Sequence, residues 1–273
     1  MAPLALTEER VDTAVGKVQV WRAGAGTPIV YLHSAMGEGP GLAFLEELAG
    51  TNDVVAPVFP GFGESEGIGE IDDMEDAVFH VLDLLDQLGL DAVPFVGLSL
   101  GGWMAAEVAT RYPERAQRLV LVNPAGLYLP DAPVADIFGK PPAELAAIMF
   151  ADQSHPVAQM MHALAERYDD PASMSEIPLE LLLPMVKSMS ATAKLGWDPY
   201  LHNPKLPRRL RRITSPTLIV HGSGDELIAR AHAEAYAAAI PDARIVDVEG
   251  AGHMLTLEKP AELARLVREF LSS

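Results

Sequence analysis

Cysteine is absent from this sequence of 273 residues, which excludes disulfide bonds, zinc–thiolate sites and cysteine nucleophiles. Positively charged residues are scarce: the sequence has 20 Lys and Arg residues and 38 Asp and Glu residues, which gives a formal net charge of −18. Such an acidic surface repels phosphate groups, so we expect neither nucleic acid nor an anionic membrane as a partner. No apolar run approaches the ~20 residues that cross a bilayer, and the N-terminus lacks the basic and apolar regions of a signal peptide. A cytoplasmic protein is the simplest expectation.

Motifs for cofactors and metal ions are missing as well. The sequence has no Gly-x-x-x-x-Gly-Lys-Ser/Thr phosphate loop and no His-Glu-x-x-His metal motif. Gly61 and Gly63 form a Gly-x-Gly pair, but the third glycine of a dinucleotide-binding fingerprint does not follow. We therefore expect no cofactor and no metal site, and a small-molecule substrate as the partner.

Hydrophobic residues make up 49% of the chain, which is enough for a large core. Many of them form short, β-branched runs that predict buried strands of a parallel sheet. Helix-period segments alternate with these runs, which favours one α/β body. The predicted strands are Val18–Trp21, Ile29–His33, Val54–Val58, Val93–Leu98, Leu119–Asn123, Thr217–His221 and Arg244–Val248. The predicted helices are Asp72–Leu88, Leu100–Arg111, Arg230–Ala239 and Ala261–Leu271.

The alternation is interrupted once, between residues 127 and 197, where prolines divide the chain into short helical segments and no strand pattern occurs. We predict a helical cap over residues 127–197, inserted into a core formed by residues 1–126 and 198–273. Thioether side chains repack around varied shapes, so methionines of this stretch, together with one after it, are predicted substrate contacts. Packing within the cap explains the same methionines equally well. The methionines of the cap are Met149, Met160, Met161, Met174, Met185 and Met189, and the predicted contacts are Met149, Met160, Met185 and Met254.

The segment Val93–Trp103 contains the motif Gly-x-Ser-x-Gly, as Gly97, Ser99 and Gly101. A predicted strand precedes the serine and a predicted helix follows it, which is the context that a nucleophilic serine on a strand-to-helix turn requires. Side chains at the flanking positions would clash in so tight a turn, which accounts for the two glycines. We predict that Ser99 is a nucleophile.

A serine hydroxyl needs a base to take its proton, and His253 is the best placed of the eight histidines. It lies on a glycine-flanked loop after the last predicted strand, where the carboxyl ends of parallel strands converge on one crevice. Asp225 follows the preceding strand and is the predicted acid, giving the chain order Ser, Asp, His. Its neighbour Glu226 is the second candidate for the acid. Asn123, at the end of an earlier strand, is an amide and cannot serve.

Attack on a carbonyl produces an oxyanion that needs N–H donors. We expect one donor to be the backbone N–H of Leu100, directly after the nucleophile. The loop after the strand Ile29–His33 should supply the other donor, and Ala35 is the favoured position. His33 itself is expected to be a structural residue of that loop rather than a catalyst.

Together these features resemble the α/β-hydrolase superfamily. The resemblance implies a mostly parallel, eight-stranded sheet flanked by helices, with a helical cap inserted after the sixth strand, where residues 127–197 fall. Two positions depart from the family pattern: Ser34 stands where glycine is usual, which is expected to narrow the oxyanion loop, and Val58 stands where many members have aspartate. The matching segments cover most of the chain and are the loop around His33, the turn Pro60–Ser65, the Ser99 motif, and Gly252–His253 followed by Glu258 and Pro260.

The leading functional hypothesis is a serine hydrolase that cleaves carboxylic esters of small to medium, apolar substrates through an acyl-enzyme on Ser99. Haloalkane dehalogenases and epoxide hydrolases of this fold use an aspartate nucleophile, so Ser99 argues against both. Hydrolases of carbon–carbon bonds in ring-cleavage products are the alternative, but they often carry an aromatic residue after the histidine, where this chain has Met254. An alternative of another class is a ligand-binding protein on a hydrolase scaffold, against which the complete set of three residues argues.

Overall fold

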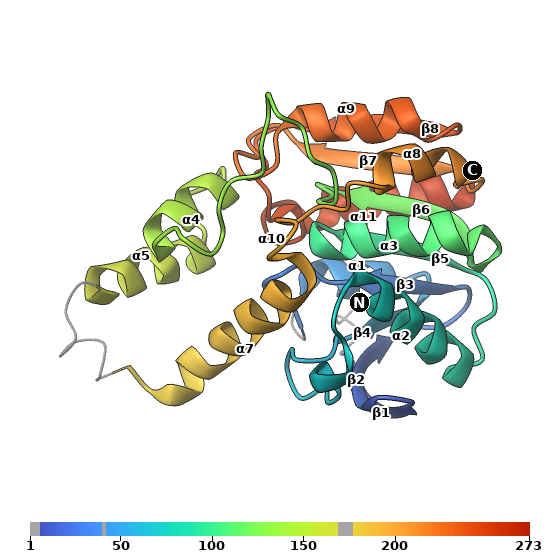
Figure 1. The fold of residues 1–273 in the computed structure, drawn as a ribbon, viewed down its shortest axis with the longest axis horizontal. Helices are drawn as coiled ribbons and strands as arrows, with labels where there is room; N and C mark the ends of the chain where they lie inside the picture. The colour runs from blue at the N-terminus through green and yellow to red at the C-terminus, as the bar shows by residue number, and fades with distance from the viewer. Residues whose placement is uncertain (1–5, 40–41, 169–176) are drawn as a thin grey trace.

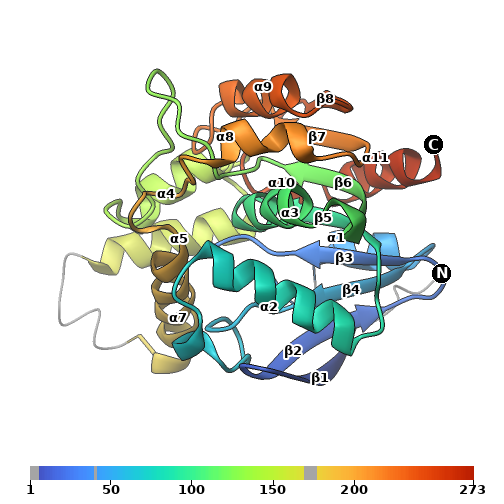
Figure 2. The ribbon, with the colours of Figure 1, turned by 45° about the vertical axis from the view of Figure 1, so that its right-hand side comes forward.

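The computed structural model describes residues 6–39, 42–168 and 177–273, and its centre is an eight-stranded sheet. The strands are β1 (Thr7–Thr13), β2 (Gly16–Ala23), β3 (Pro28–Leu32), β4 (Asp53–Pro57), β5 (Val93–Leu98), β6 (Ala116–Val122), β7 (Thr217–Gly222) and β8 (Ala243–Val248). Their order across the sheet is β1-β2-β4-β3-β5-β6-β7-β8. β2 pairs antiparallel with β1 and β4, and β3 to β8 run parallel (Figures 1 and 2). The mostly parallel, eight-stranded sheet that the resemblance implied is confirmed.

Helices cover both faces of the sheet. They are α1 (Ala43–Ala49), α2 (Met74–Gln87), α3 (Leu100–Arg111), α4 (Pro142–Met149), α5 (Pro156–Tyr168), α7 (Leu179–Gly196), α8 (Leu206–Arg209), α9 (Arg230–Ala239), α10 (Leu255–Glu258) and α11 (Pro260–Ser272), with 3₁₀ turns η1 (Ile68–Glu70), η2 (Pro113–Arg115) and η3 (Leu210–Arg212). α1 and α11 pack against each other on one face. α2 and α3 contact each other on the opposite face, where α3 lies against β5 and β6 (Figure 1).

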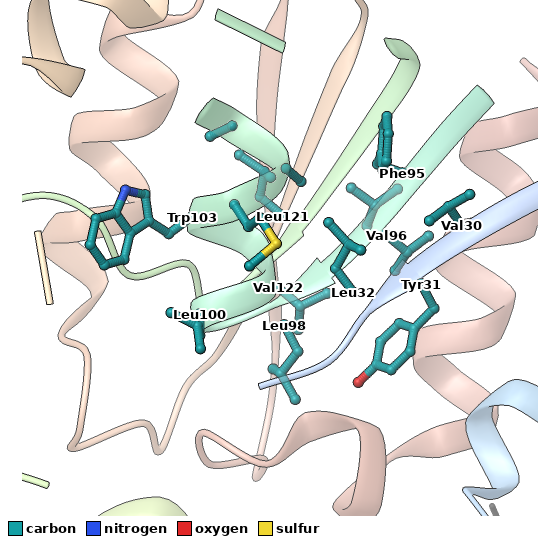
Figure 3. Close-up of a cluster of buried hydrophobic side chains, with 14 of the residues drawn as sticks. Val30, Tyr31, Leu32, Phe95, Val96, Leu98, Leu100, Trp103, Leu121 and Val122 are labelled. Carbon is teal, nitrogen blue, oxygen red and sulfur yellow. The ribbon is translucent and has the colours of Figure 1, made fainter. Parts of the chain in front are cut away.

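The core is densest where β3, β5 and β6 meet α3. Every residue of β5 is buried, as expected for a central strand that is covered on both faces. Figure 3 shows side chains of these strands together with Leu100 and Trp103 from the first turn of α3. This packing fixes the carboxyl end of β5, and with it the residue between β5 and α3, which is Ser99.

All seven strands predicted from apolar runs are present, with ends that differ by a few residues. The additional strand is β1, whose residues are mostly exposed and whose sequence, TEERVDT, has no apolar run. It pairs along its whole length with β2, from Thr7 opposite Arg22 to Thr13 opposite Gly16. Pairing with a neighbour therefore makes this segment a strand, and burial of its own side chains contributes little.

Residues 127–197 contain no strand among those that the structure describes, and they hold α4, α5 and α7. Figures 1 and 2 show these helices together at one end of the sheet. The chain enters and leaves this stretch at one place, because the Gly126 N–H donates to the Leu201 carbonyl at 3.0 Å and the Asn203 N–H donates to the Gly126 carbonyl at 3.0 Å. Pro142 and Pro156 stand at helix starts, where a missing N–H costs no hydrogen bond. Within the described ranges, no helix is long and apolar enough to span a bilayer.

Candidate active site

Ser99 lies on the strand-to-helix turn that the Gly-x-Ser-x-Gly motif predicts. Its backbone has φ 55° and ψ −111°, a conformation that side-chain-bearing residues rarely adopt. A Cβ at Gly97 would lie 2.4 Å from the Gly101 carbonyl oxygen, and a Cβ at Gly101 would lie 2.0 Å from the Leu32 carbonyl oxygen. Both positions therefore require glycine. The turn places Ser99 at the N-terminal end of α3, beyond the carboxyl end of β5.

Asp225 and His253 are joined by a hydrogen bond between two buried side chains. The Nδ1 atom of His253 lies 2.8 Å from Oδ2 of Asp225, and the side chains are 1% and 0% exposed. The other carboxylate oxygen, Oδ1, accepts the backbone N–H groups of Leu227 and Ile228, both at 2.9 Å. An ionised carboxylate only accepts, so the proton of this bond lies on Nδ1; in the neutral form of the imidazole the lone pair is then on Nε2. These three hydrogen bonds fix the ring and its tautomer.

Glu226, the second candidate for the acid, is exposed. Its backbone N–H donates to the Ile148 carbonyl at 3.2 Å, which turns the peptide toward α4. The geometry therefore places Asp225, and not Glu226, against His253. Burial lowers the pKa of the nearby His221, an effect larger than the opposing charges of Asp225 and Asp247, so His221 adds no positive charge beside Asp225 at neutral pH.

The loop after β3 is shaped by Ser34 and by a residue that the sequence did not single out, Glu38. The Ser34 N–H donates to Oε2 of Glu38 at 2.8 Å, and the Ser34 hydroxyl donates to Oε1 of the same carboxylate. The Ser34 oxygen in turn accepts the Met36 N–H at 3.0 Å. The hydroxyl is thus fully engaged within its own loop. Among the described residues, the N–H groups of Ala35 and Leu100 donate to no acceptor, as expected of groups available to an oxyanion.

His33 is a structural residue of this loop, as predicted. Its Nδ1 atom lies 2.7 Å from the Ser34 carbonyl oxygen, and its Nε2 atom accepts the Phe59 N–H at 2.9 Å. Burial is the main cause that lowers the pKa of His33, although the carboxylate of Glu38 opposes it. The ring is therefore neutral and ties β3 to the segment after β4.

Ser99 and His253 line one apolar cavity at the carboxyl ends of the parallel strands, and Asp225 contacts His253 from outside this lining. Ser34, Ser99 and His253 are the polar side chains in the described part of its lining. The rest of the lining is apolar and consists of Ala35, Met36, Leu100, Ala125, Val134, Ile137, Leu145, Met149, Met189, Leu201, Leu227 and Ile228. Segments after β3, β5, β6 and β7, the loop of His253, and α4 and α7 all contribute to this lining. The site is thus assembled from segments that are far apart in the sequence.

Comparison with known proteins identifies the family. A family model described as the alpha/beta hydrolase fold matches residues 27–260. The chain belongs to the α/β-hydrolase family. Among curated relatives, it is 29% identical to a 2-hydroxymuconate semialdehyde hydrolase of Pseudomonas sp. (strain CF600), over 92% of this chain and 88% of that protein.

Two solved structures show how widely the α/β-hydrolase fold is shared. A meta-cleavage product hydrolase from Pseudomonas fluorescens IP01 superposes with a TM-score of 0.76 at 20% identity, covering 97% of each chain. The naproxen esterase of Bacillus subtilis superposes with a TM-score of 0.71 at 21% identity, covering 98% of this chain and 92% of that one. At these identities the likeness concerns the fold alone.

Three of the four predicted methionine contacts lie outside the described lining of the cavity in this α/β-hydrolase. Met160 on α5 is 62% exposed and Met185 on α7 is 41% exposed, and neither lines the cavity. Met254 is fully buried but is also absent from the lining, and its N–H donates to the Met149 carbonyl at 3.2 Å. Met149 does line the cavity, and Met189, one helical turn after Met185, lines it as well. Met174, which the sequence placed in the same cap, lies outside the described residues.

Proposed function

We propose that this α/β-hydrolase cleaves neutral carboxylic esters with apolar acyl groups, through an acyl-enzyme on Ser99. The supporting observation is the lining of the cavity beside Ser99 and His253, in which the described side chains include no Lys, Arg, Asn or Gln. An apolar cavity takes ligands by burial of apolar surface, with orientation supplied by the few polar groups at the reacting centre.

The proposed mechanism assigns one role to each group. His253 Nε2 takes the proton of Ser99 as the hydroxyl oxygen bonds to the ester carbonyl, and Asp225 stabilises the imidazolium that forms. The N–H groups of Leu100 and Ala35 stabilise the oxyanion. The imidazolium then protonates the departing alcohol, which leaves the acyl group on Ser99. A water molecule, deprotonated by the same imidazole, releases the carboxylic acid and restores the serine.

Hydrolysis of a carbon–carbon bond is the second candidate, and the curated relative described above favours it. The names of other relatives, such as 2-hydroxy-6-oxo-2,4-heptadienoate hydrolase, describe substrates that carry a carboxylate. A buried carboxylate requires a cation or several hydrogen-bond donors. The described lining includes no Lys or Arg. Its donors are the groups that the proposed mechanism uses at the reacting centre and the Ser34 hydroxyl, which donates to Glu38. Met254 also stands where an aromatic residue is often found in that group of enzymes. We therefore rank neutral esters first.

A matched pair of esters tests this ranking. p-Nitrophenyl butyrate and mono-p-nitrophenyl succinate have acyl groups of similar size, and the second carries a carboxylate. We expect kcat/KM to be about 100-fold higher for the butyrate, because burying an unpaired carboxylate costs several kcal/mol. Equal turnover of both esters, or turnover of a 2-hydroxy-6-oxo-dienoate alone, would contradict the proposal.

The serine is tested by Ser99→Ala, with Ser272→Ala, at an exposed position of α11, as the control. We expect Ser99→Ala to abolish ester turnover and labelling by an alkyl fluorophosphonate while the protein remains folded. Tight binding of the ester without turnover by the wild type would favour a ligand-binding protein on this scaffold.

A further inference from the structure

The loop that carries His253 touches the end of α4 through its backbone. The Met254 N–H donates to the carbonyl of Met149, the last residue of α4, at 3.2 Å. A Cβ at Gly252 would lie 2.6 Å from that same carbonyl oxygen and 2.7 Å from the backbone nitrogen of Ala151. The two segments are therefore so close that only glycine fits at position 252. His253 and Met149 also line the same cavity.

Glu258 is the side chain that joins these two segments. Its Oε2 atom accepts the Gly252 N–H at 2.6 Å, and its Oε1 atom accepts the Asp152 N–H at 2.8 Å. The carboxylate lies at the end of α10 and is half-buried. One of its oxygens thus holds the residue directly before His253, and the other holds the turn that follows α4.

Asn123 is a second residue that holds the same loop. Its amide donates to the carbonyl oxygens of Gly252 and His253, at 3.2 and 2.9 Å. Asn123 belongs to the core, at the end of β6, whereas Glu258 also binds the segment after α4. Of these two clamps, Glu258 is therefore the one that ties the cap side of the cavity to the imidazole.

We propose that Glu258 is a positioning residue, which uses its two carboxylate oxygens to couple the docking of residues 149–152 to the placement of the His253 imidazole. The inference rests on the proposed role of His253 as the base for Ser99. Each hydrogen bond has a charged acceptor, and such bonds are about twice as strong as neutral ones. A shift of about 1 Å in a catalytic group can cost about 100-fold in rate, so release of this clamp should slow the chemical step more than it weakens binding.

The test is Glu258→Gln, because glutamine has the shape of glutamate but only one acceptor oxygen for the two N–H groups. Glu262→Gln, at an exposed position in the first turn of α11, is the matched control. The readouts are the rate of Ser99 labelling by an alkyl fluorophosphonate, kcat and KM for p-nitrophenyl butyrate, and Tm. We expect Glu258→Gln to lower the labelling rate and kcat together by about 10-fold, with KM within about twofold of wild type. Glu258→Ala should lower both rates further.

Labelling as fast as wild type in Glu258→Gln would overturn the inference. A lower Tm with an unchanged labelling rate per folded molecule would overturn it too, since that result describes a purely structural residue. The labelling readout also separates this inference from the proposed function. If the wild type labels readily but turns over no ester, the ester proposal fails, and the effect of Glu258→Gln on labelling still decides the role of Glu258.

Discussion

Replacing Asn123 with alanine is expected to lower the free energy of unfolding by about 3–5 kcal/mol. The residue is fully buried, and besides its two bonds to the His253 loop, its Oδ1 atom accepts the Gly222 N–H at 3.0 Å. Alanine leaves that buried N–H without an acceptor, which costs about 1–3 kcal/mol, and it removes the donor for two carbonyl oxygens. The backbone at position 123 has φ 41°, a left-handed conformation that costs alanine about 1–2 kcal/mol.

Urea unfolding followed by fluorescence measures this difference, and two further variants separate its parts. Asn123→Gly removes the same hydrogen bonds without the left-handed penalty, so it should be more stable than Asn123→Ala by about 1 kcal/mol. Asn52→Ala is the control, because the hydrogen bonds of the Asn52 amide are exposed and water can replace them: it donates to the Thr27 carbonyl at 3.3 Å and accepts the Thr51 hydroxyl at 2.8 Å. Their loss should cost less than about 1 kcal/mol.

Asn123→Ala should also slow labelling of Ser99 by a fluorophosphonate, because the loop of His253 loses one of the two side chains that hold it. An Asn123→Ala variant within about 1 kcal/mol of wild type would refute the reasoning, since that is the size expected for one ordinary hydrogen bond. So would a loss of stability equal to that of Asn52→Ala. Either result would mean that the loop is held by its packing and that the three hydrogen bonds of Asn123 contribute little.

Three further changes test other parts of the structure. Gly101→Ala should prevent formation of the turn at the nucleophile, because its Cβ would lie 2.0 Å from the Leu32 carbonyl oxygen; folded protein that still labels with fluorophosphonate would contradict this. Burial lowers the pKa of His80 from 6.5 to about 4, so the unfolded chain binds more protons than the folded one between these pH values. The stability that this neutral histidine contributes is complete above about pH 6.5 and is lost as the pH falls toward 4, by up to ~3 kcal/mol. His80→Leu should reduce this loss, which Tm measurements across that pH range would show. Glu107→Gln should cost about 3 kcal/mol in urea unfolding, because the fully buried carboxylate pairs with Arg111 and its replacement leaves that guanidinium with the exposed carboxylate of Glu75, at 3.8 Å, as its counter-charge; an unchanged midpoint would contradict the assignment.

The sequence by itself determined the features that depend on short stretches of chain. Apolar runs of four to six residues predicted seven of the eight strands, because the central strands, covered on both faces, require such runs. The two glycines around Ser99 predicted the strained turn. A side chain at Gly97 would clash with the backbone of Gly101, four residues later, and one at Gly101 would clash with the end of the neighbouring strand β3. The polar strand β1 escaped this reasoning, because it is held by backbone pairing with β2 and not by burial of its own side chains.

Only the tertiary structure decided which side chains meet across long stretches of sequence. The hydrogen bonds of Asn123 to Gly252 and His253 span about 130 residues, and that of Glu258 to Asp152 spans 106. No local pattern encodes such contacts, because they depend on how the loops after separate strands are brought to one edge of the sheet. The same reason explains why Met185 faces solvent while Met149 and Met189 line the cavity: composition marks a stretch as apolar, and packing decides which side of each helix is buried.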